Sequence, residues 1–342
     1  MTDHHDELQA TLANIMAPGK GILAADESTP TITKRFSAVG IESNEATRRA
    51  YRSLLFTTPG ADASLGGVIL FEETLGQKAD DGTPFAQALS KRGILPGIKV
   101  DKGTTALPGA PGDLITQGLD GLAERLDAYK AQGARFTKWR EVYPITDRNP
   151  TPLGIAANAE VLARYAGICQ QQGLVPIVEP EVLIDGGHSI ERCAEVTEAV
   201  LHAVFDALHR HRVVTEAIIL KPNMVVPGKA NARKAAPEEV AAATLRVLRR
   251  TVPSSVPTIN FLSGGQTPEE ATANLNAMNV QDGGAPWILS FSFARALQDP
   301  VMALWKGAAG NVAAAQAAFG HRLQMASRAR EGTWSQSLER QR

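Results

Sequence analysis

The feature of this 342-residue chain that most constrains its fold is a short apolar run that recurs eight times. The runs begin near Ile22, Val68, Ile98, Arg135, Val175, Ala217, Thr258 and Ile288. The interval between runs varies from 30 residues, from Val68 to Ile98, to 46 residues, from Ile22 to Val68. Each interval can hold a strand, a crossover helix and two loops, as parallel strands require. The pattern predicts a closed (β/α)8 TIM barrel, with a doubly wound open sheet as the alternative.

The segments between the runs carry helix signals. Leu119–Tyr129 and Asn158–Cys169 have apolar residues at intervals of three and four. The segment Thr267-Pro-Glu-Glu270 has the pattern of an N-cap, a first-turn proline and a capping-box glutamate. The stretch from Thr104 to Gly118 is rich in glycine and proline and is expected to be one loop.

The whole chain is expected to form one domain. We expect a single barrel domain over residues 1–342, with an N-terminal helical segment over about 1–18 and a C-terminal helical segment and tail over about 307–342. The polar tail that begins at Trp334 is expected to be docked on the surface or mobile.

Composition and charge exclude several classes of protein. Hydrophobic residues make up 44% of the chain, enough for a large core, so disorder and coiled coil are excluded. The net charge of −1 gives no attraction to nucleic acid or to a membrane surface, and no apolar stretch is long enough to span a bilayer. The first seven residues lack a secretory or transit signal, and two cysteines are too few for a disulfide framework. These observations predict a cytoplasmic protein.

Polar and charged residues gather where the predicted strands end. They are Asp26, Lys102, Lys138, Arg140, Glu179, Glu181, Lys221, Ser263 and Ser292, with Arg295 just beyond. The C-terminal ends of the strands form the active-site face of a barrel. Because strand side chains alternate, Lys138 shares a face with Arg140, and Glu179 shares one with Glu181.

Taken singly, most of these residues have ordinary explanations. Asp26 could cap a helix, the two glutamates could point to solvent, Ser263-Gly-Gly265 could form a tight turn, and Lys102 could be a solvated loop residue. Lys221 follows Ile-Ile-Leu, where a solvated lysine is least expected. The common position of all these residues at one end of the strands favours a site.

The charge at this end predicts an anionic ligand. Five cations and three carboxylates give it a net charge of +2 within a chain of net charge −1. Ser263-Gly-Gly265 precedes a helix at the seventh strand, and the seventh and eighth strands of a barrel often form a phosphate site. A phosphorylated small molecule is therefore expected.

Lys221 indicates the chemistry. An uncharged lysine can attack a ketone, and desolvation and a nearby cation such as Lys138 favour the uncharged form. Glu179 could move the protons needed to form an iminium, which then accepts electrons as a carbon–carbon bond breaks. Asp26 could remove the hydroxyl proton that starts this retro-aldol cleavage.

At these residues the sequence resembles class I fructose-bisphosphate aldolase, the Schiff-base type. The matching stretches are Gly19-KGILAADES-Thr29, Gly97-IKVDK-Gly103, Phe136-TKW-Arg140, Val175-PIVEP-Glu181, Leu220-KPN-Met224, Phe261-LSGG-Gln266 and Ser292-FARA-Leu297. The resemblance covers roughly Gly19 to Lys306. It implies a TIM barrel, a homotetramer, no cofactor and no metal, and cleavage of fructose 1,6-bisphosphate to dihydroxyacetone phosphate and glyceraldehyde 3-phosphate in glycolysis and gluconeogenesis.

The resemblance also implies residue roles. Lys221 matches the Schiff-base lysine and Glu179 the main proton acceptor, while Glu181, Lys138 and Asp26 match supporting catalytic groups. The residues that match the site for the phosphate on the ketone half are Ser263, Gly264, Gly265, Ser292 and Arg295. Those that match the handling of the other phosphate are Arg35, Lys102, Arg140, Ser28 and Thr31.

The sequence departs from the animal members of the family at three places. Pro30 stands where they usually have glycine, which could stiffen the first phosphate loop. Phe293-Ala294 replaces Tyr-Gly before the arginine, and the chain lacks a terminal tyrosine.

Three other functions remain as alternatives. One is a Schiff-base lyase or transaldolase acting on another sugar phosphate, and a second is a non-catalytic sugar-phosphate-binding scaffold. A metal-dependent aldolase is disfavoured because zinc needs grouped histidines, whereas His188, His202, His209, His211 and His321 lie in predicted loops or helices. The sequence does not distinguish a preference for fructose 1,6-bisphosphate from one for fructose 1-phosphate.

Overall fold

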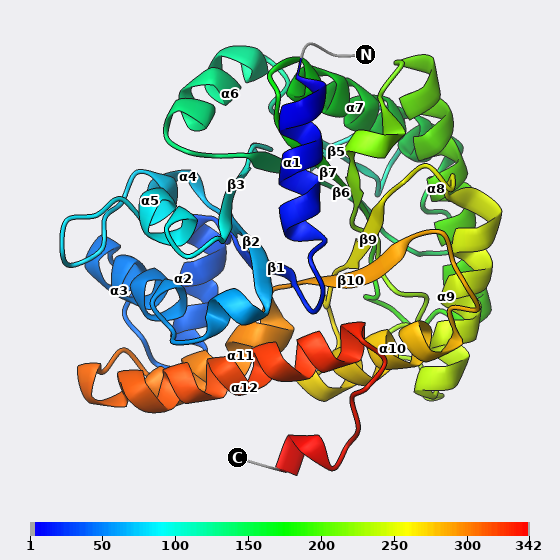
Figure 1. The fold of residues 1–342 in the computed structure, drawn as a ribbon. Helices are drawn as coiled ribbons and strands as arrows, with labels where there is room; N and C mark the ends of the chain where they lie inside the picture. The colour runs from blue at the N-terminus through cyan, green and yellow to red at the C-terminus, as the bar shows by residue number, and fades with distance from the viewer. Residues whose placement is uncertain (1–3, 341–342) are drawn as a thin grey trace.

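The computed structural model describes residues 4–340 and shows a closed barrel of eight parallel strands ringed by helices (Figure 1). The barrel strands are β1 (Gly21–Ala25), β2 (Leu65–Leu70), β3 (Leu95–Lys99), β6 (Phe136–Tyr143), β7 (Val175–Val182), β8 (Ile219–Leu220), β9 (Thr258–Phe261) and β10 (Ile288–Phe293). β1 pairs with both β2 and β10, so the sheet has no edge. The predicted TIM barrel is confirmed, and the open-sheet alternative is wrong.

Helices follow the strands in the predicted alternation. They are α1 (His5–Ile15), α2 (Thr29–Ser37), α3 (Glu45–Phe56), α4 (Glu72–Leu75), α5 (Phe85–Ser90), α6 (Leu122–Ala131), α7 (Pro152–Gln171), α8 (Ile190–Arg210), α9 (Pro237–Thr251), α10 (Pro268–Gln281), α11 (Arg295–Trp305) and α12 (Val312–Arg330). The predicted capping box at α10 is present, with Thr267 and Glu270 bonding each other's backbone.

One local expectation was wrong. The stretch from Thr104 to Gly118 is not a plain loop, because β4 (Thr104–Ala106) and β5 (Leu114–Thr116) pair in it as an antiparallel hairpin. The sixth barrel strand, predicted to begin near Ala217, comprises Ile219–Leu220 and follows a 3-10 turn at Thr215–Ala217. Short β-branched runs beside glycine and proline are ambiguous between these structures.

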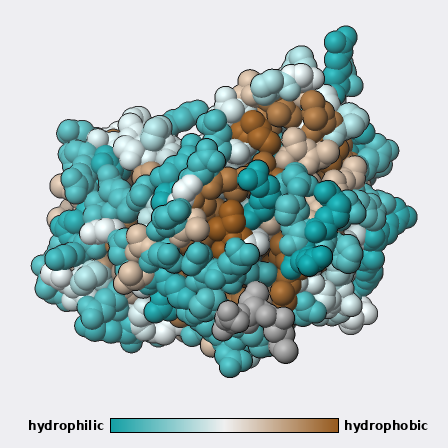
Figure 2. All heavy atoms as spheres, turned by 90° about the horizontal axis from the view of Figure 1, so that it is seen from above, coloured by the Kyte–Doolittle hydropathy of each residue, from teal (hydrophilic) through white to brown (hydrophobic). Residues whose placement is uncertain are grey.

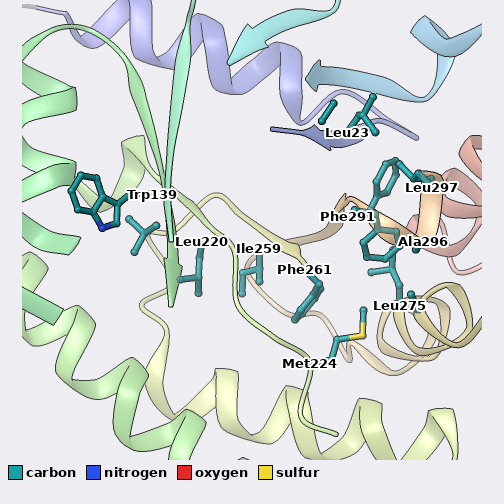
Figure 3. Close-up of a cluster of buried hydrophobic side chains, with 14 of the residues drawn as sticks. Leu23, Trp139, Leu220, Met224, Ile259, Phe261, Leu275, Phe291, Ala296 and Leu297 are labelled. Carbon is teal, nitrogen blue, oxygen red and sulfur yellow. The ribbon is translucent and has the colours of Figure 1, made fainter. Parts of the chain in front are cut away.

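The barrel wall separates two hydrophobic clusters. The larger lies between the strands and the surrounding helices, and Figure 3 shows members of it from β1, β6, β8, β9 and β10 beside residues of α10 and α11. The smaller fills the barrel interior with residues such as Ile22, Phe136 and Ile177, and it includes Leu8 and Leu12 of α1. Helix α1 therefore closes one end of the barrel, as Figure 1 shows, and leaves the other end for polar side chains.

The C-terminal segment packs along the outside of the barrel. α12 lies against α10 and α11, and beyond it Trp334 packs on the core while Glu339 contacts Arg322 of α12. The tail is thus docked on the surface of the α10 and α12 layer. On the face that carries α6 and α7, hydrophobic residues gather in the middle of a hydrophilic rim (Figure 2). No helix in the described part of the chain is long and apolar enough to cross a membrane.

Candidate active site

Strand alternation turns a set of charged side chains into the barrel. Ala24 of β1 belongs to the interior cluster, and Asp26 continues the same face two residues later. Ile219 of β8 stands in the same relation to Lys221. The same alternation places Lys138, Arg140, Glu179, Glu181 and Ser292 inside. The polar end of the barrel interior is therefore fixed by the register of the strands.

Four of these side chains form a continuous line of ionic contacts. Lys221 Nζ lies 3.1 Å from Glu179 Oε1, and Glu179 Oε2 lies 3.1 Å from Lys138 Nζ. Lys138 Nζ also donates to Asp26 Oδ2 at 2.9 Å. All four residues are buried. Two lysines and two carboxylates thus alternate in an interior from which most water is excluded.

The electrostatics keep most of this line charged. Burial would raise the pKa of the Asp26 carboxyl, but the positive charges of Lys138 and Lys221 outweigh it and hold that pKa well below its usual range. Burial would also raise the pKa of the Glu179 carboxyl, but the positive charges of Lys138 and Lys221 outweigh burial and lower that pKa. Burial would lower the pKa of the Lys138 ammonium, but the negative charges of Asp26 and Glu179 outweigh burial and raise that pKa. Lys138 therefore remains a cation close to Lys221.

Glu181 lies outside this line. It forms an ion pair with Arg140 Nε, and a Cβ at Gly264 would lie 3.1 Å from Glu181 Oε1. Among the described residues, the ion pair of Glu181 is with Arg140 and not with Lys221 or Lys138. The reason is geometric, because Glu181 is one pleat farther along β7 than Glu179 and faces the barrel mouth.

The residues expected at the ketone-half phosphate do meet. The Ser263-Gly-Gly265 turn follows β9, and Ser263 Oγ accepts from Ala296 N of α11 at 3.4 Å. A Cβ at Gly264 would lie only 3.4 Å from Arg295 Nη2, and Gly265 has a φ of +79°, which favours glycine. Ser292 Oγ is buried with no hydrogen-bond partner among the described residues. Backbone N–H groups, two hydroxyls and an exposed guanidinium thus converge.

Apart from Arg140, which pairs with Glu181, the residues expected at the other phosphate fall into two groups. Ser28 and Thr31 share a hydrogen bond of 3.1 Å at the start of α2, and Arg35 follows one turn later. Lys102 stands apart on the loop after β3, where it is half exposed and paired with Glu72 at 3.0 Å. Lys102 lies on the opposite side of the chain from the inward-facing residues, so the structure does not bring it into the line of contacts described above.

Sequence reasoning missed two residues beside Asp26. Lys99 is the last residue of β3 and pairs in register with Lys138. Its positive charge helps to lower the pKa of Asp26 against the opposing effect of burial, though less than the charges of Lys138 and Lys221 do. Its Nζ lies 3.2 Å from Asp101 Oδ1, and Asp101 is buried. The signal was present in the sequence, because Lys99 and Asp101 alternate with the core residues Ile98 and Val100.

The structure accommodates two of the departures from the animal pattern. Pro30 occupies the first turn of α2 behind the N-cap Ser28, where a proline costs no helical hydrogen bond. Ala294 has a φ of −105°, so its position does not require glycine. Phe293 packs in the core, where the centroids of its ring and the Phe291 ring are 5.6 Å apart. The described residues contain no group of three or more potential metal ligands, and both cysteines are free and buried.

Comparison with known proteins agrees with this geometry. The family model for fructose-bisphosphate aldolase class-I matches residues 7–342. Cytosolic fructose-bisphosphate aldolase 6 of Arabidopsis thaliana is 57% identical over 96% of this chain and 92% of its own length. The probable class 1 fructose-bisphosphate aldolase of Xanthomonas campestris pv. campestris is 53% identical over 96% of this chain and 98% of its own.

Solved structures give the same result. The fructose-bisphosphate aldolase of Plasmodium falciparum, solved in complex with TRAP and a small-molecule inhibitor, superposes with a TM-score of 0.96 at 49% identity. The superposition covers 98% of this chain and 97% of that one. With the family model matched from residue 7 to residue 342, the chain belongs to the class I fructose-bisphosphate aldolase family.

Proposed function

We propose that this protein is a lyase that cleaves fructose 1,6-bisphosphate reversibly to dihydroxyacetone phosphate and glyceraldehyde 3-phosphate through a Schiff base on Lys221. The observation that carries the proposal is the line of contacts from Lys221 through Glu179 and Lys138 to Asp26 in the barrel interior. The reaction serves glycolysis in the cleavage direction and gluconeogenesis in the other.

The first half of the reaction needs a lysine that can lose its proton. Glu179 Oε1 lies 3.1 Å from Lys221 Nζ and can accept that proton directly. The free amine then attacks the C2 ketone carbon of the sugar to form a carbinolamine. A proton returned from Glu179 allows the C2 hydroxyl to leave as water, and an iminium forms. Lys138 Nζ lies 3.1 Å from the other oxygen of Glu179 and so holds that carboxylate beside Lys221.

The second half breaks the C3–C4 bond. A base removes the proton of the C4 hydroxyl, the C4 carbonyl of glyceraldehyde 3-phosphate forms, and the bonding electrons move into the iminium as an enamine. Asp26 is ionised by its contact with Lys138 and is our candidate for this base. Protonation of the enamine at C3 and hydrolysis of the iminium by water then release dihydroxyacetone phosphate and restore Lys221.

Two phosphate sites position the substrate across the barrel mouth. We assign the phosphate on the ketone half to Ser263, Gly264, Gly265, Ser292 and Arg295, which converge at the ends of β9 and β10. We assign the phosphate on the aldehyde half to Ser28, Thr31, Arg35 and Arg140. Lys99 joins this second group in place of Lys102, because Lys99 faces into the barrel and Lys102 is held by Glu72.

Covalent trapping tests the proposed function. Borohydride added with dihydroxyacetone phosphate should reduce the iminium and add mass to the peptide that contains Lys221. Lys221→Met should lose both the adduct and the cleavage of fructose 1,6-bisphosphate. An adduct on Lys138, or activity that needs a metal and forms no adduct, would contradict the proposal.

We also propose a cytoplasmic homotetramer. The family resemblance implies the tetramer, and Figure 2 shows hydrophobic residues gathered on one face, as on surfaces that bind partners. Relatives named as cytosolic support the location. Light scattering should give about 146 kDa, four times the chain mass of 36.4 kDa.

A further inference from the structure

A second ionic network begins at Glu27, the residue after Asp26. It consists of Glu27, Arg35, Arg52 and Asp299, of which Asp299 is the most exposed. Arg35 of α2 forms ion pairs with two carboxylates, Glu27 through Nη1 and Asp299 through Nη2, the latter at 2.8 Å. The Arg35 side chain is 15% exposed, whereas that of Asp299 on α11 is 51% exposed. One carboxylate therefore holds Arg35 from inside and the other from the solvent side.

Glu27 is fixed by the fold. Arg52 Nη2 donates to Glu27 Oε2 at 2.8 Å, and Gln298 Nε2 donates to Oε1 at 3.0 Å. Gln298 in turn donates to the carbonyl of Ala24 on β1 at 2.7 Å and accepts from Tyr51 at 3.1 Å. Glu27 thus joins β1, α2, α3 and α11, and it anchors the inner arm of Arg35.

Within the part of the chain that the structure describes, the outer arm of Arg35 is the one ion-pair partner of Asp299. Because Arg35 and Arg52 are balanced by Glu27 and Asp299, this network carries no net charge. A phosphate that approaches Arg35 must therefore either displace Asp299 or bind beside a carboxylate.

Helix α11 also carries Arg295, one turn before Asp299. Arg295 lies four residues before Asp299 on α11, so both side chains lie on one face of the helix. Within residues 4–340 no ion pair to Arg295 is present. The cation of the ketone-half phosphate site is thus available, while Arg35 on the aldehyde half is already occupied.

We infer that Asp299 is a specificity-determining residue that competes with the phosphate on C6 for Arg35 and so weakens the preference for fructose 1,6-bisphosphate over fructose 1-phosphate. The inference rests on the proposed function, in particular on the assignment of Arg35 to the aldehyde-half phosphate. Fructose 1-phosphate has no phosphate on C6, so it does not meet Asp299 in this way.

The size of the effect follows from the exposure of the ion pair. Solvent-exposed ion pairs contribute about 0.2–1 kcal/mol, so freeing Arg35 should strengthen binding of the C6 phosphate by roughly 1.4- to fivefold. Asp299→Asn removes the charge with little change of shape. We expect KM for fructose 1,6-bisphosphate to fall by roughly that factor, with KM for fructose 1-phosphate unchanged.

Asp206→Asn is a matched control. Asp206 is also a helical aspartate paired with an arginine, Arg210 at 3.1 Å, but it lies on the surface of α8, which follows β7. This control should leave both KM values unchanged. Arg35→Gln should raise KM for the bisphosphate, and in that background Asp299→Asn should have no effect. Arg35→Lys replaces the glutamine variant if thermal melting shows that the latter is unfolded.

The outcomes separate the inference from the proposed function. Equal changes for both sugars in Asp299→Asn, or no change, would overturn the inference even where Arg35→Gln raises KM for the bisphosphate. An unchanged KM in Arg35→Gln would also overturn it, because no phosphate would then compete for Arg35. Borohydride trapping at Lys221 tests the aldolase reaction independently of either result.

Discussion

Glu179 Oε1 lies 3.1 Å from Lys221 Nζ, and its other oxygen lies 3.1 Å from Lys138 Nζ. One carboxylate thus contacts both the proposed nucleophile and the cation that remains charged beside it. A proton taken from Lys221 stays within the line of contacts, because Glu179 is buried and has both lysines as neighbours. This position makes Glu179 the proton carrier of the proposed mechanism.

Removing the charge of Glu179 should therefore impair chemistry more than removing that of Glu181. Glu179→Gln should lower kcat by ~10²–10⁴-fold, the usual contribution of a positioned acid–base group. Glu181→Gln should affect kcat less, because the ion pair of Glu181 is with Arg140. Steady-state kinetics on fructose 1,6-bisphosphate measures both effects. If Glu181→Gln were the inactive variant, the roles of the two glutamates would be the reverse of those proposed.

Arg295 should contribute to binding of both sugars. Arg295→Ala removes a charge-assisted contact to the phosphate on the ketone half, worth about 1.5–3 kcal/mol, so KM should rise roughly ten- to a hundredfold. Because fructose 1-phosphate carries the same phosphate, its KM should rise as well. An unchanged KM for both sugars would exclude Arg295 from this site.

Lys99 and Lys102 form a natural matched pair of variants. Lys99 faces into the barrel beside Asp101, and Lys102 is half exposed and paired with Glu72. Lys99→Met should lower kcat/KM for fructose 1,6-bisphosphate at least tenfold, because it removes a largely shielded positive charge next to Asp26 and the substrate. Lys102→Met should stay within about twofold. The opposite order would restore Lys102 to the phosphate site.

The inward-facing residues could be predicted from the sequence because strand alternation is local. Asp26, Lys138, Glu179 and Lys221 follow apolar residues on strands whose limits were nearly correct. The same alternation identifies Lys99 as well, whereas the prediction placed Lys102 as the charged residue at the end of that strand.

Contacts across the barrel could not be predicted in this way. The pairing of Arg35 with Asp299 joins residues 264 positions apart, and it depends on how α2 packs beside α11. The pairing of Glu181 with Arg140 depends equally on side-chain packing at the barrel mouth. Such contacts are set by tertiary geometry, which residue spacing along one chain does not encode locally.

A buried acid outside the active site should govern part of the pH dependence of stability. Glu141 of β6 is fully buried on the outward face of its strand, where its Oε1 accepts from the Trp139 indole at 2.8 Å and its Oε2 has no partner among the described residues. Burial raises the pKa of Glu141 to about 8 from a usual value of 4.5. The folded protein therefore binds a proton that the unfolded chain has lost between these values.

The sign follows from this proton difference. Because the folded state holds the extra proton, the free energy of unfolding should fall as pH rises from about 4.5 to 8, by up to ~1.4 kcal/mol per pH unit from this group. Glu141→Gln, which cannot ionise, should remove that slope. Denaturant unfolding at several pH values measures it, with the exposed Glu195→Gln as control. An unaltered slope in Glu141→Gln would show that Glu141 is ionised in the folded protein.

The tail tests whether the C-terminus takes part in the reaction. It lacks a tyrosine, and Trp334 has no titratable proton near neutral pH, so it cannot act as an acid or base. The structure docks this segment against α10 and α12. Glu339 Oε2 lies 2.6 Å from Arg322 Nη1, and the Trp334 indole donates to Glu339 Oε1 at 3.0 Å.

Deleting the residues after Gly332 should therefore affect stability more than catalysis. The deletion leaves the buried Arg322 without its carboxylate and uncovers the core beneath Trp334, which should cost roughly 1–3 kcal/mol of unfolding free energy. The kcat for fructose 1,6-bisphosphate should stay within about threefold, because proton transfer rests on Glu179. KM should change more than kcat on deletion of the tail, because Trp334 and Glu339 line a cleft of about 520 Å³ that also reaches Gly265 of the phosphate turn.

Glu339→Gln, which keeps the tail but weakens its anchor, should share the loss of stability and leave kcat unchanged. A large loss of kcat in the truncated protein, with its melting curve still cooperative and its oligomer intact, would show that the tail enters the active site during turnover.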